Sequence, residues 1–164
     1  MNSSLLILAN HLGDYLLKQQ KHITTAESCT GGLIAATLTE IAGSSAWFER
    51  GFVTYSNEAK MELLGVQAKT LENYGAVSRQ TAGEMAIGAL NYSHADLAIA
   101  VTGIAGPSGG TVLKPVGTVF IAWAIKNSEP IINQYLFIGN RADIRKQTVS
   151  EALDLQIIKG LFKK

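Results

Sequence analysis

The sequence predicts an α/β fold: a three-layer α/β/α sandwich in which helices cover both faces of a mixed β-sheet. Segments with strand character alternate with segments of helical spacing, a pattern typical of α/β proteins. Residues 96–102 form an almost continuous apolar run, which indicates a central strand buried on both faces. Two further runs, 118–125 and 131–138, are joined by a turn that contains Asn127 and Pro130. They predict a late hairpin, which makes the sheet mixed.

The composition is typical of a single globular domain. A chain of 164 residues is long enough to bury a core, and 47% hydrophobic against 16% charged residues argues against disorder. The formal net charge is +1, without a basic stripe interleaved with aromatic residues, so we expect no nucleic-acid partner. Because the sequence has no internal repeat, low-complexity tract or linker, residues 1–164 are interpreted as one domain.

The N-terminal segment and the cysteine content indicate the compartment. The apolar run 5–9 lacks a preceding basic segment and is soon interrupted by Asn10 and Asp14, so we expect neither a signal peptide nor a membrane span. The single cysteine, Cys29, cannot form an internal disulfide, which fits a reducing compartment. The cysteine and the three histidines lack zinc-ligand spacing. We therefore expect a cytoplasmic protein without a metal.

The first elements are indicated by leucine spacing and β-branched residues. Residues 2–4 offer N-caps for a helix whose leucines between 5 and 16 share one face. Residues 21–25 mix β-branched and polar side chains, as in a short strand. Residues 33–41 have helical spacing and stop just before Gly43, a residue typical of helix C-termini.

The middle of the chain predicts a second strand and then helices. Residues 51–55 have strand character, and Ser56 offers a cap for a short helix at 58–64. A loop with one helical turn is expected at 71–75. Ser78 begins a longer helix whose small residues suit close packing on a sheet.

The end of the chain leads from the central strand through a glycine-rich loop at 103–110 into the hairpin. After the hairpin we predict one long helix from about residue 141 to residue 161. Its inward face is expected to carry Ile144, Thr148, Ala152 and Leu155.

Ligands of α/β sheets bind where strands end and helices begin, and the first candidate there is the turn around Ser28. This serine lies where the strand passes into the helix. The amides of residues 29–32 would be the unpaired donors of the first helical turn, facing an anion or oxyanion. On this stretch alone, however, an N-cap role for Ser28 or Thr30 is favoured over a nucleophile.

The second candidate is the segment 55–60, which ends in Lys60. An ordinary lysine titrates near about 10.4, whereas a lysine that acts as general base has a pKa of about 7–8. The helix N-terminus supplies only about 0.3–1 kcal/mol of the roughly 4 kcal/mol required, so burial must supply most of the decrease. Tyr55 would end the preceding strand and orient or relay a proton. The alternative is a solvated surface lysine and an aromatic residue at the edge of the core.

The third candidate is the glycine-rich loop that begins at Gly103. Its amides could hold a phosphate, although it matches neither the Walker A nor the dinucleotide pattern and an ordinary turn is the alternative. Arg145 or Arg141, early in the last helix, could clamp a phosphate or carboxylate, unless both are surface charges. Cys29 is a rival nucleophile without an evident base, and it is interpreted as a small buried residue.

Five motifs that occur in order support a family resemblance. They are TAESCTGG at 25–32, IAGSSAWF at 41–48, GFVTYSNEAK at 51–60, GAVS at 75–78 and TGIAGP at 102–107. This series resembles the CinA C-terminal domain family from about Thr24 to the end of the chain. The segment 108–114 and the C-terminal tail are less distinctive.

The resemblance implies an α/β/α sandwich, generally a homodimer, that deamidates nicotinamide mononucleotide to nicotinate mononucleotide and ammonia without a metal or cofactor. Carried over by position, Ser28 is the nucleophile, Lys60 the general base and Tyr55 an assisting residue. The Gly31–Gly32 turn would supply an oxyanion hole. The expected substrate-binding residues are Thr30, Gly31, Gly32, Ser45, Gly103, Ile104, Ala105, Gly106 and Arg145.

Two alternatives remain open at this stage. The same fold could form a non-catalytic nucleotide-binding or regulatory domain, although the joint presence of Ser28, Tyr55 and Lys60 argues against it. The substrate could also be a related pyridine nucleotide or another nucleotide amide. Larger CinA proteins carry an additional N-terminal pyrophosphatase-like domain, for which this chain has no room, so that activity is not expected.

Overall fold

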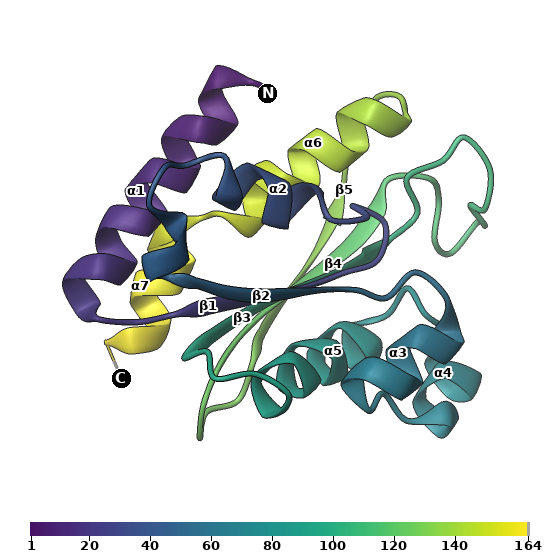
Figure 1. The fold of residues 1–164 in the computed structure, drawn as a ribbon. Helices are drawn as coiled ribbons and strands as arrows, with labels where there is room; N and C mark the ends of the chain where they lie inside the picture. Colours follow the sequence, from purple (N-terminus) through teal and green to yellow (C-terminus); the bar gives the residue numbers. More distant parts are fainter. Residues whose placement is uncertain (164) are drawn as a thin grey trace.

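The computed structural model describes residues 1–163 and places one mixed β-sheet between two layers of helices (Figure 1). The strands are β1 (Ile23–Glu27), β2 (Phe48–Val53), β3 (Leu97–Gly103), β4 (Thr118–Ile125) and β5 (Ile131–Leu136). The helices are α1 (Ser3–Gln19), α2 (Leu33–Thr39), α3 (Asn57–Leu64), α4 (Ala68–Tyr74), α5 (Arg79–Asn91), α6 (Arg141–Ala152) and α7 (Leu155–Phe162), with a 3₁₀ turn at Ser44–Ala46.

The sheet confirms the predicted α/β fold class. Its strand order is β2-β1-β3-β4-β5. The first three strands are parallel, and β4 and β5 complete the sheet as antiparallel neighbours. The carboxyl ends of β1 and β3 therefore lie side by side, because Glu27 is in register with Val101. Loops that follow these two strands meet at the same edge of the sheet.

Each helical layer packs on its own hydrophobic core. Helices α1, α2, α6 and α7 cover one face, and α3, α4 and α5 cover the other (Figure 1). The first core contains the buried Trp47 and Trp123, and the indole of Trp123 donates to the Ala152 carbonyl at 2.9 Å. In the second core, small residues such as Ala82 and Ala86 of α5 pack with Ala100 of β3. Within residues 1–163, no helix combines the length and apolar character that crossing a membrane requires.

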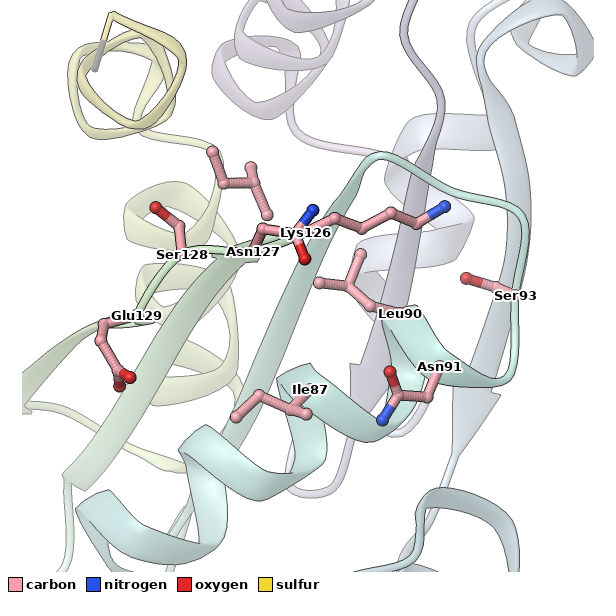
Figure 2. Close-up of a pocket in the computed structure, with 9 residues that line it drawn as sticks. Ile87, Leu90, Asn91, Ser93, Lys126, Asn127, Ser128 and Glu129 are labelled. Carbon is pink, nitrogen blue, oxygen red and sulfur yellow. The ribbon is translucent and has the colours of Figure 1, made fainter.

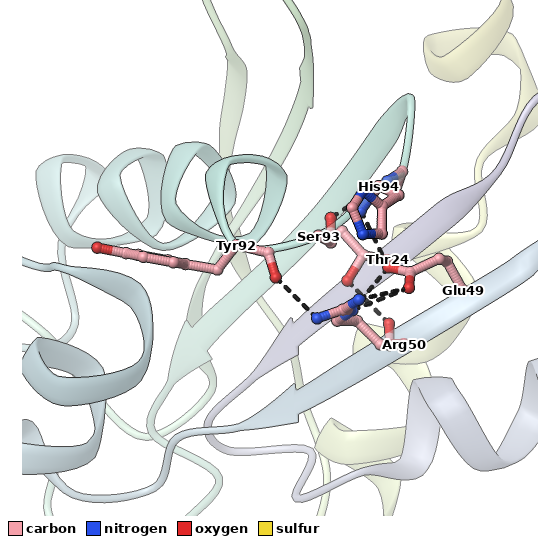
Figure 3. A network of polar contacts seen from close by, with 7 residues as sticks. Thr24, Glu49, Arg50, Tyr92, Ser93 and His94 are labelled. Carbon is pink, nitrogen blue, oxygen red and sulfur yellow. Dashed lines mark hydrogen bonds and ion pairs between the residues drawn. The ribbon is translucent and has the colours of Figure 1, made fainter.

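A polar network holds the edge strand β2 at the end of the sheet where β1 begins (Figure 3). Arg50 forms an ion pair with its neighbour Glu49 at 2.7 Å and donates to the Tyr92 carbonyl at 3.0 Å. The carboxylate of Glu49 also accepts the backbone N–H of His94 at 3.2 Å. This network fixes β2 to the connection between α5 and β3.

Two of the predicted element boundaries were wrong near the candidate site and at the C-terminus. The second strand begins at Phe48 and ends at Val53, so Tyr55 lies beyond it. The long helix predicted at 141–161 is two helices, α6 and α7. The break occurs because the carboxylate of Asp154 accepts the N–H groups of Gln156 at 2.8 Å and Ile157 at 3.4 Å and begins a new helix.

Helix α3 approaches α5 at a glycine. A β-carbon on Gly88 would overlap the carbonyl oxygen of Leu64, the last residue of α3. Overpacking against side chains costs about 1–3 kcal/mol, and here the obstacle is backbone. We therefore predict that Gly88→Ala lowers the free energy of unfolding by about 3 kcal/mol or more, measured by urea denaturation.

Gly160 in α7 is the matched control, because a β-carbon there would meet no atom within 4 Å. Gly160→Ala should raise the free energy of unfolding by about 0.5–1 kcal/mol through helix propensity. Similar effects of the two substitutions would contradict the close contact between α3 and α5.

Candidate active site

The carboxyl edge of the parallel strands carries a cavity of about 280 Å³. All three sequence-predicted stretches contribute to its wall: Ser28 after β1, Lys60 of α3, and the loop that begins at Gly103 after β3. Tyr55 lines it as well. Three stretches that are far apart in the sequence therefore lie around one cavity.

The contact between Ser28 and Lys60 is the central feature of this cavity. The Lys60 Nζ lies 3.0 Å from the Ser28 Oγ. It also lies 3.0 Å from the carbonyl oxygen of Thr54 and 3.2 Å from that of Tyr55. Both side chains are buried, with 1% of Lys60 and 8% of Ser28 exposed. The serine hydroxyl is thus paired with an amine that water barely reaches.

The local sequence accounts for the position of the lysine. Ser56 caps α3, and its Oγ accepts the N–H of Ala59 at 3.0 Å. Lys60 follows in the chain, and its side chain points back to the end of the β2 segment, where the carbonyls of Thr54 and Tyr55 accept its N–H groups. Burial lowers the pKa of the Lys60 ammonium, which agrees in direction and cause with the sequence prediction.

The three contacts of the Lys60 Nζ accommodate either protonation state of the amine. A neutral lysine amine has two N–H donors and one lone pair, whereas an ammonium has three donors and no acceptor. Two backbone carbonyls take the two N–H groups of Lys60. In the ammonium, the third N–H donates to the Ser28 Oγ at 3.0 Å. In the neutral amine, which burial favours, the lone pair takes that place and can accept the hydroxyl proton.

The turn after Ser28 differs from the predicted oxyanion hole. The N–H of Gly31 donates to the Ser28 carbonyl at 3.0 Å and is therefore not available to a ligand. Thr30, Gly31 and Gly32 do not line the cavity, whereas Cys29 does. Within residues 1–163, the N–H of Cys29 has no protein acceptor. Within the turn 29–32, the free amide at the cavity is thus the one that directly follows Ser28.

Arg145, predicted to clamp a substrate group, does not line the cavity. Its guanidinium donates to the carbonyls of Cys29 at 3.2 Å and Thr30 at 2.8 Å, and so holds the turn after Ser28. The arginine at the cavity is Arg141. Arg141 donates to the Gly106 carbonyl at 2.9 Å and to the Tyr55 hydroxyl at 3.0 Å. The guanidinium next to the cavity is therefore that of Arg141, the second of the two arginines that the sequence offered for this role.

Tyr55 and Ser45 also lie differently from the expectation. The Tyr55 side chain is 60% exposed, and its hydroxyl contacts Arg141, while its backbone carbonyl contacts Lys60. Ser45 is an exposed residue of the 3₁₀ turn before β2, at the end of the sheet where β1 begins. Because Ser28 follows the other end of β1, Ser45 lies away from the cavity, and its contact with the substrate stays a prediction.

The glycine-rich loop after β3 lies at the cavity. Gly103, Ile104, Ala105 and Gly106 all line the cavity. The N–H of Ile104 donates to the Thr118 carbonyl at 2.9 Å, so the loop is anchored to β4. The predicted residues of this loop therefore lie beside Ser28 and Lys60.

Cys29 is buried, as the sequence indicated, whereas the role of Glu27 was missed. Burial raises the pKa of the Cys29 thiol to about 11, so the thiol is neutral at pH 7 and is a poor rival to Ser28. Glu27 was missed, although its carboxylate accepts two N–H groups at the start of α2. The signal was an acidic residue shortly before a helix without a capping side chain.

A larger cavity of about 720 Å³ lies elsewhere (Figure 2). It is formed by the C-terminal end of α5 and the turn between β4 and β5, with Ile87, Asn91, Lys126 and Glu129 in its wall. None of the predicted site residues lines it. No group of three or more His, Cys, Asp or Glu residues among residues 1–163 is arranged to hold a metal ion.

Comparison with known proteins identifies the family. A sequence model of the CinA C-terminal domain matches residues 6–159. The chain belongs to the CinA C-terminal domain family. The nicotinamide-nucleotide amidohydrolase PncC of Escherichia coli K12 is 51% identical over 152 residues, which cover 93% of this chain and 92% of the relative. The CinA-like protein of Endomicrobium trichonymphae is 55% identical over 148 residues, which cover 90% of this chain and 34% of that protein.

Solved structures of the CinA family share the fold. The competence/damage inducible protein CihA from Agrobacterium tumefaciens superposes with a TM-score of 0.93 at 48% identity, over 96% of each chain. The CinA superfamily protein ECK1530/EC0983 from Escherichia coli superposes with a TM-score of 0.89 at 37% identity, over 96% of this chain and 92% of its own.

Burial of Lys60 makes the free energy of unfolding depend on pH. Its pKa is lower in the folded protein than the about 10.4 of an unfolded chain, so the unfolded state binds more protons between these two values. The free energy of unfolding therefore rises with pH across this window, by up to about 1.4 kcal/mol per pH unit. We predict that Lys60→Met removes this rise, measured by urea unfolding between about pH 6 and pH 10.

The exposed Lys69 of α4 provides the control, and Lys69→Met should keep the wild-type dependence. If Lys60→Met also keeps it, Lys60 binds its proton equally well in the folded and unfolded states, and the argument from burial fails.

Proposed function

We propose that this chain is a nicotinamide-nucleotide amidohydrolase, which converts nicotinamide mononucleotide and water to nicotinate mononucleotide and ammonia. The observation that carries the proposal is the 3.0 Å contact between the buried Lys60 amine and the Ser28 hydroxyl at a cavity. A carboxamide is unreactive, so its hydrolysis needs a nucleophile activated by a nearby base. The 51% identity to PncC enzymes supports the substrate.

In the proposed reaction, the Ser28 oxygen attacks the carboxamide carbon while the neutral Lys60 amine accepts the hydroxyl proton. The resulting ammonium protonates the departing nitrogen, which leaves as ammonia, and the acyl group remains as an ester on Ser28. Water then attacks the ester with Lys60 again as the base. Nicotinate mononucleotide leaves, and Ser28 recovers its proton.

The tetrahedral intermediates need a donor for their oxyanion. We assign this role first to the backbone N–H of Cys29, because the amide after the nucleophile serves in this way in serine hydrolases with a strand–turn–helix nucleophile. Cys29 lines the cavity. Arg145 assists from outside, since its bonds to the carbonyls of Cys29 and Thr30 hold the turn in place.

The substrate phosphate is assigned to Arg141 and the loop Gly103–Gly106. A guanidinium pairs well with phosphate oxygens, and Arg141 is the arginine that lines the cavity. Tyr55, whose hydroxyl accepts a hydrogen bond from Arg141 at 3.0 Å, orients this guanidinium in the proposal. The assisting role of Tyr55 thus concerns binding as well as the proton network.

One prediction of the proposed function concerns the pair of Ser28 and Lys60. We expect purified, chelator-treated protein to release ammonia from nicotinamide mononucleotide, and Ser28→Ala and Lys60→Met to fold but lose on the order of 10³-fold or more of turnover. The activity of the wild type should rise with pH through the lowered pKa of Lys60, because the base acts in its neutral form. Ammonia release and circular dichroism check both parts.

Lys69→Met serves as the control and should turn over normally. Near-normal turnover in Ser28→Ala or Lys60→Met would remove that residue from the mechanism. A folded wild type that binds the nucleotide without releasing ammonia would instead support the non-catalytic nucleotide-binding domain.

Another prediction distinguishes the roles proposed for Arg141 and Arg145. Arg141→Gln should raise KM for nicotinamide mononucleotide by about 10- to 100-fold, which corresponds to the free energy of one hydrogen bond to a charged group. The hydrolysis of nicotinamide riboside, which lacks the phosphate, should stay almost unchanged. Arg145→Gln should lower kcat for both substrates. Lys146→Gln, at an exposed position of the same helix, is the control. An equal loss with both substrates in Arg141→Gln would contradict the phosphate assignment.

The homodimer that the family resemblance implies and the cytoplasmic location that the N-terminal segment and the single cysteine indicate stay predictions, and neither is needed for the chemistry proposed here.

A further inference from the structure

Glu27 is a fully buried carboxylate next to Ser28 in the chain, with 0% of its surface exposed. Its Oε1 accepts the N–H of Ile34 at 2.8 Å, and its Oε2 accepts the N–H of Ala35 at 3.0 Å. The N-cap residue of helix α2 is Gly32, which has no side chain to accept a hydrogen bond from the first turn. Glu27 therefore supplies the negative charge that the first turn of α2 attracts.

The backbone of Glu27 reaches the other half of the site. Its carbonyl accepts the N–H of Thr54 at 2.9 Å. The carbonyl of Thr54 in turn accepts a hydrogen bond from the Lys60 Nζ at 3.0 Å. Glu27 is thus covalently bonded to Ser28, and it is hydrogen-bonded to Thr54, whose carbonyl accepts from the Lys60 amine.

We propose that Glu27 is a positioning residue that sets the Ser28 hydroxyl against the Lys60 amine. The proposal rests on the function proposed above, in which this pair performs the chemistry. Glu27 does not line the cavity, and both of its carboxylate oxygens face the amides of α2. It therefore acts on the reaction through Ser28 and not as an acid, a base or a substrate ligand.

The chemistry of the carboxylate explains why no other side chain suffices. Two backbone N–H donors require two acceptor oxygens, and charge-assisted bonds of this kind are about twice as strong as neutral ones. A glutamine has one acceptor oxygen, so its NH₂ group would face the second N–H. The start of α2 must then shift, and the turn 28–32 lies between α2 and the fixed end of β1. A misplacement of about 1 Å at a reacting group can cost on the order of 10²-fold in rate.

The test is Glu27→Gln, with Glu84→Gln as the matched control. Glu84 of α5 also accepts the backbone N–H of a residue at a helix N-terminus, Gln67 before α4, at 2.9 Å, and it lies outside the catalytic cavity. We expect Glu27→Gln to lower kcat for nicotinamide mononucleotide by about 10- to 100-fold with KM changed less than about threefold. Glu84→Gln should keep the wild-type kcat, whatever stability it loses.

A second readout does not depend on the substrate. Phenylmethanesulfonyl fluoride forms a sulfonate ester on an activated serine with loss of fluoride, and mass spectrometry measures the rate at Ser28. We expect labelling of Glu27→Gln to slow by a similar factor to kcat, and labelling of Glu84→Gln to stay at the wild-type rate. If the wild type does not hydrolyse the nucleotide, the proposed function fails, and the labelling rates alone decide the role of Glu27.

Three results would overturn the proposal. The first is a kcat and labelling rate of folded Glu27→Gln within twofold of wild type. The second is a loss confined to KM. The third is failure to fold of both Glu27→Gln and Glu27→Asp, since the carboxylate would then serve the core and not the alignment. If only Glu27→Asp folds, its shorter carboxylate reaches fewer amides, and its kcat should fall at least about tenfold.

Discussion

The buried amine of Lys60 depends on neutral partners, and this constraint organises the cavity. Its three neighbours are the Ser28 hydroxyl and the carbonyls of Thr54 and Tyr55, none of which carries a formal charge. A buried ammonium without a counterion is costly, so the group releases its proton more readily. A carboxylate in the same place would reverse this effect and hold the lysine protonated. The absence of charge around Lys60 is therefore as important to the proposed chemistry as the short distance to Ser28.

The pair is assembled from elements that are far apart in the sequence. Ser28 stands at the end of β1, whereas Lys60 comes from α3 in the layer that packs on the second core. Helix α6, from the opposite layer, contributes Arg141 to the cavity wall and Arg145 to the turn after Ser28. The site thus spans the edge of the sheet and both helical layers.

The sequence predicted the parts of this structure that depend on local pattern. The central strand, the hairpin and the cap at Ser56 all follow from neighbouring residues. The choice between Arg141 and Arg145 does not, because the two lie one helical turn apart on the same side of α6 and only tertiary packing decides which reaches the cavity. The contact between Ser28 and Lys60, 32 residues apart, was likewise suggested by the family motifs and not by spacing. The break at Asp154 was a missed local signal, since an aspartate before an apolar run is a typical N-cap.

Glu27 also explains where an anionic substrate group can be recognised. A strand–turn–helix unit usually offers the helix N-terminus to a phosphate. In this chain the N–H groups of Ile34 and Ala35 are already bonded to the Glu27 carboxylate, and a second anion there would meet its negative charge. Recognition of a phosphate must then come from the other wall of the cavity, where Arg141 and Gly106 lie in contact. In the proposed function, the internal carboxylate thereby separates two tasks that many α/β sites combine: the β1–α2 turn is left to the nucleophile, and the loop after β3 together with α6 is left to the nucleotide.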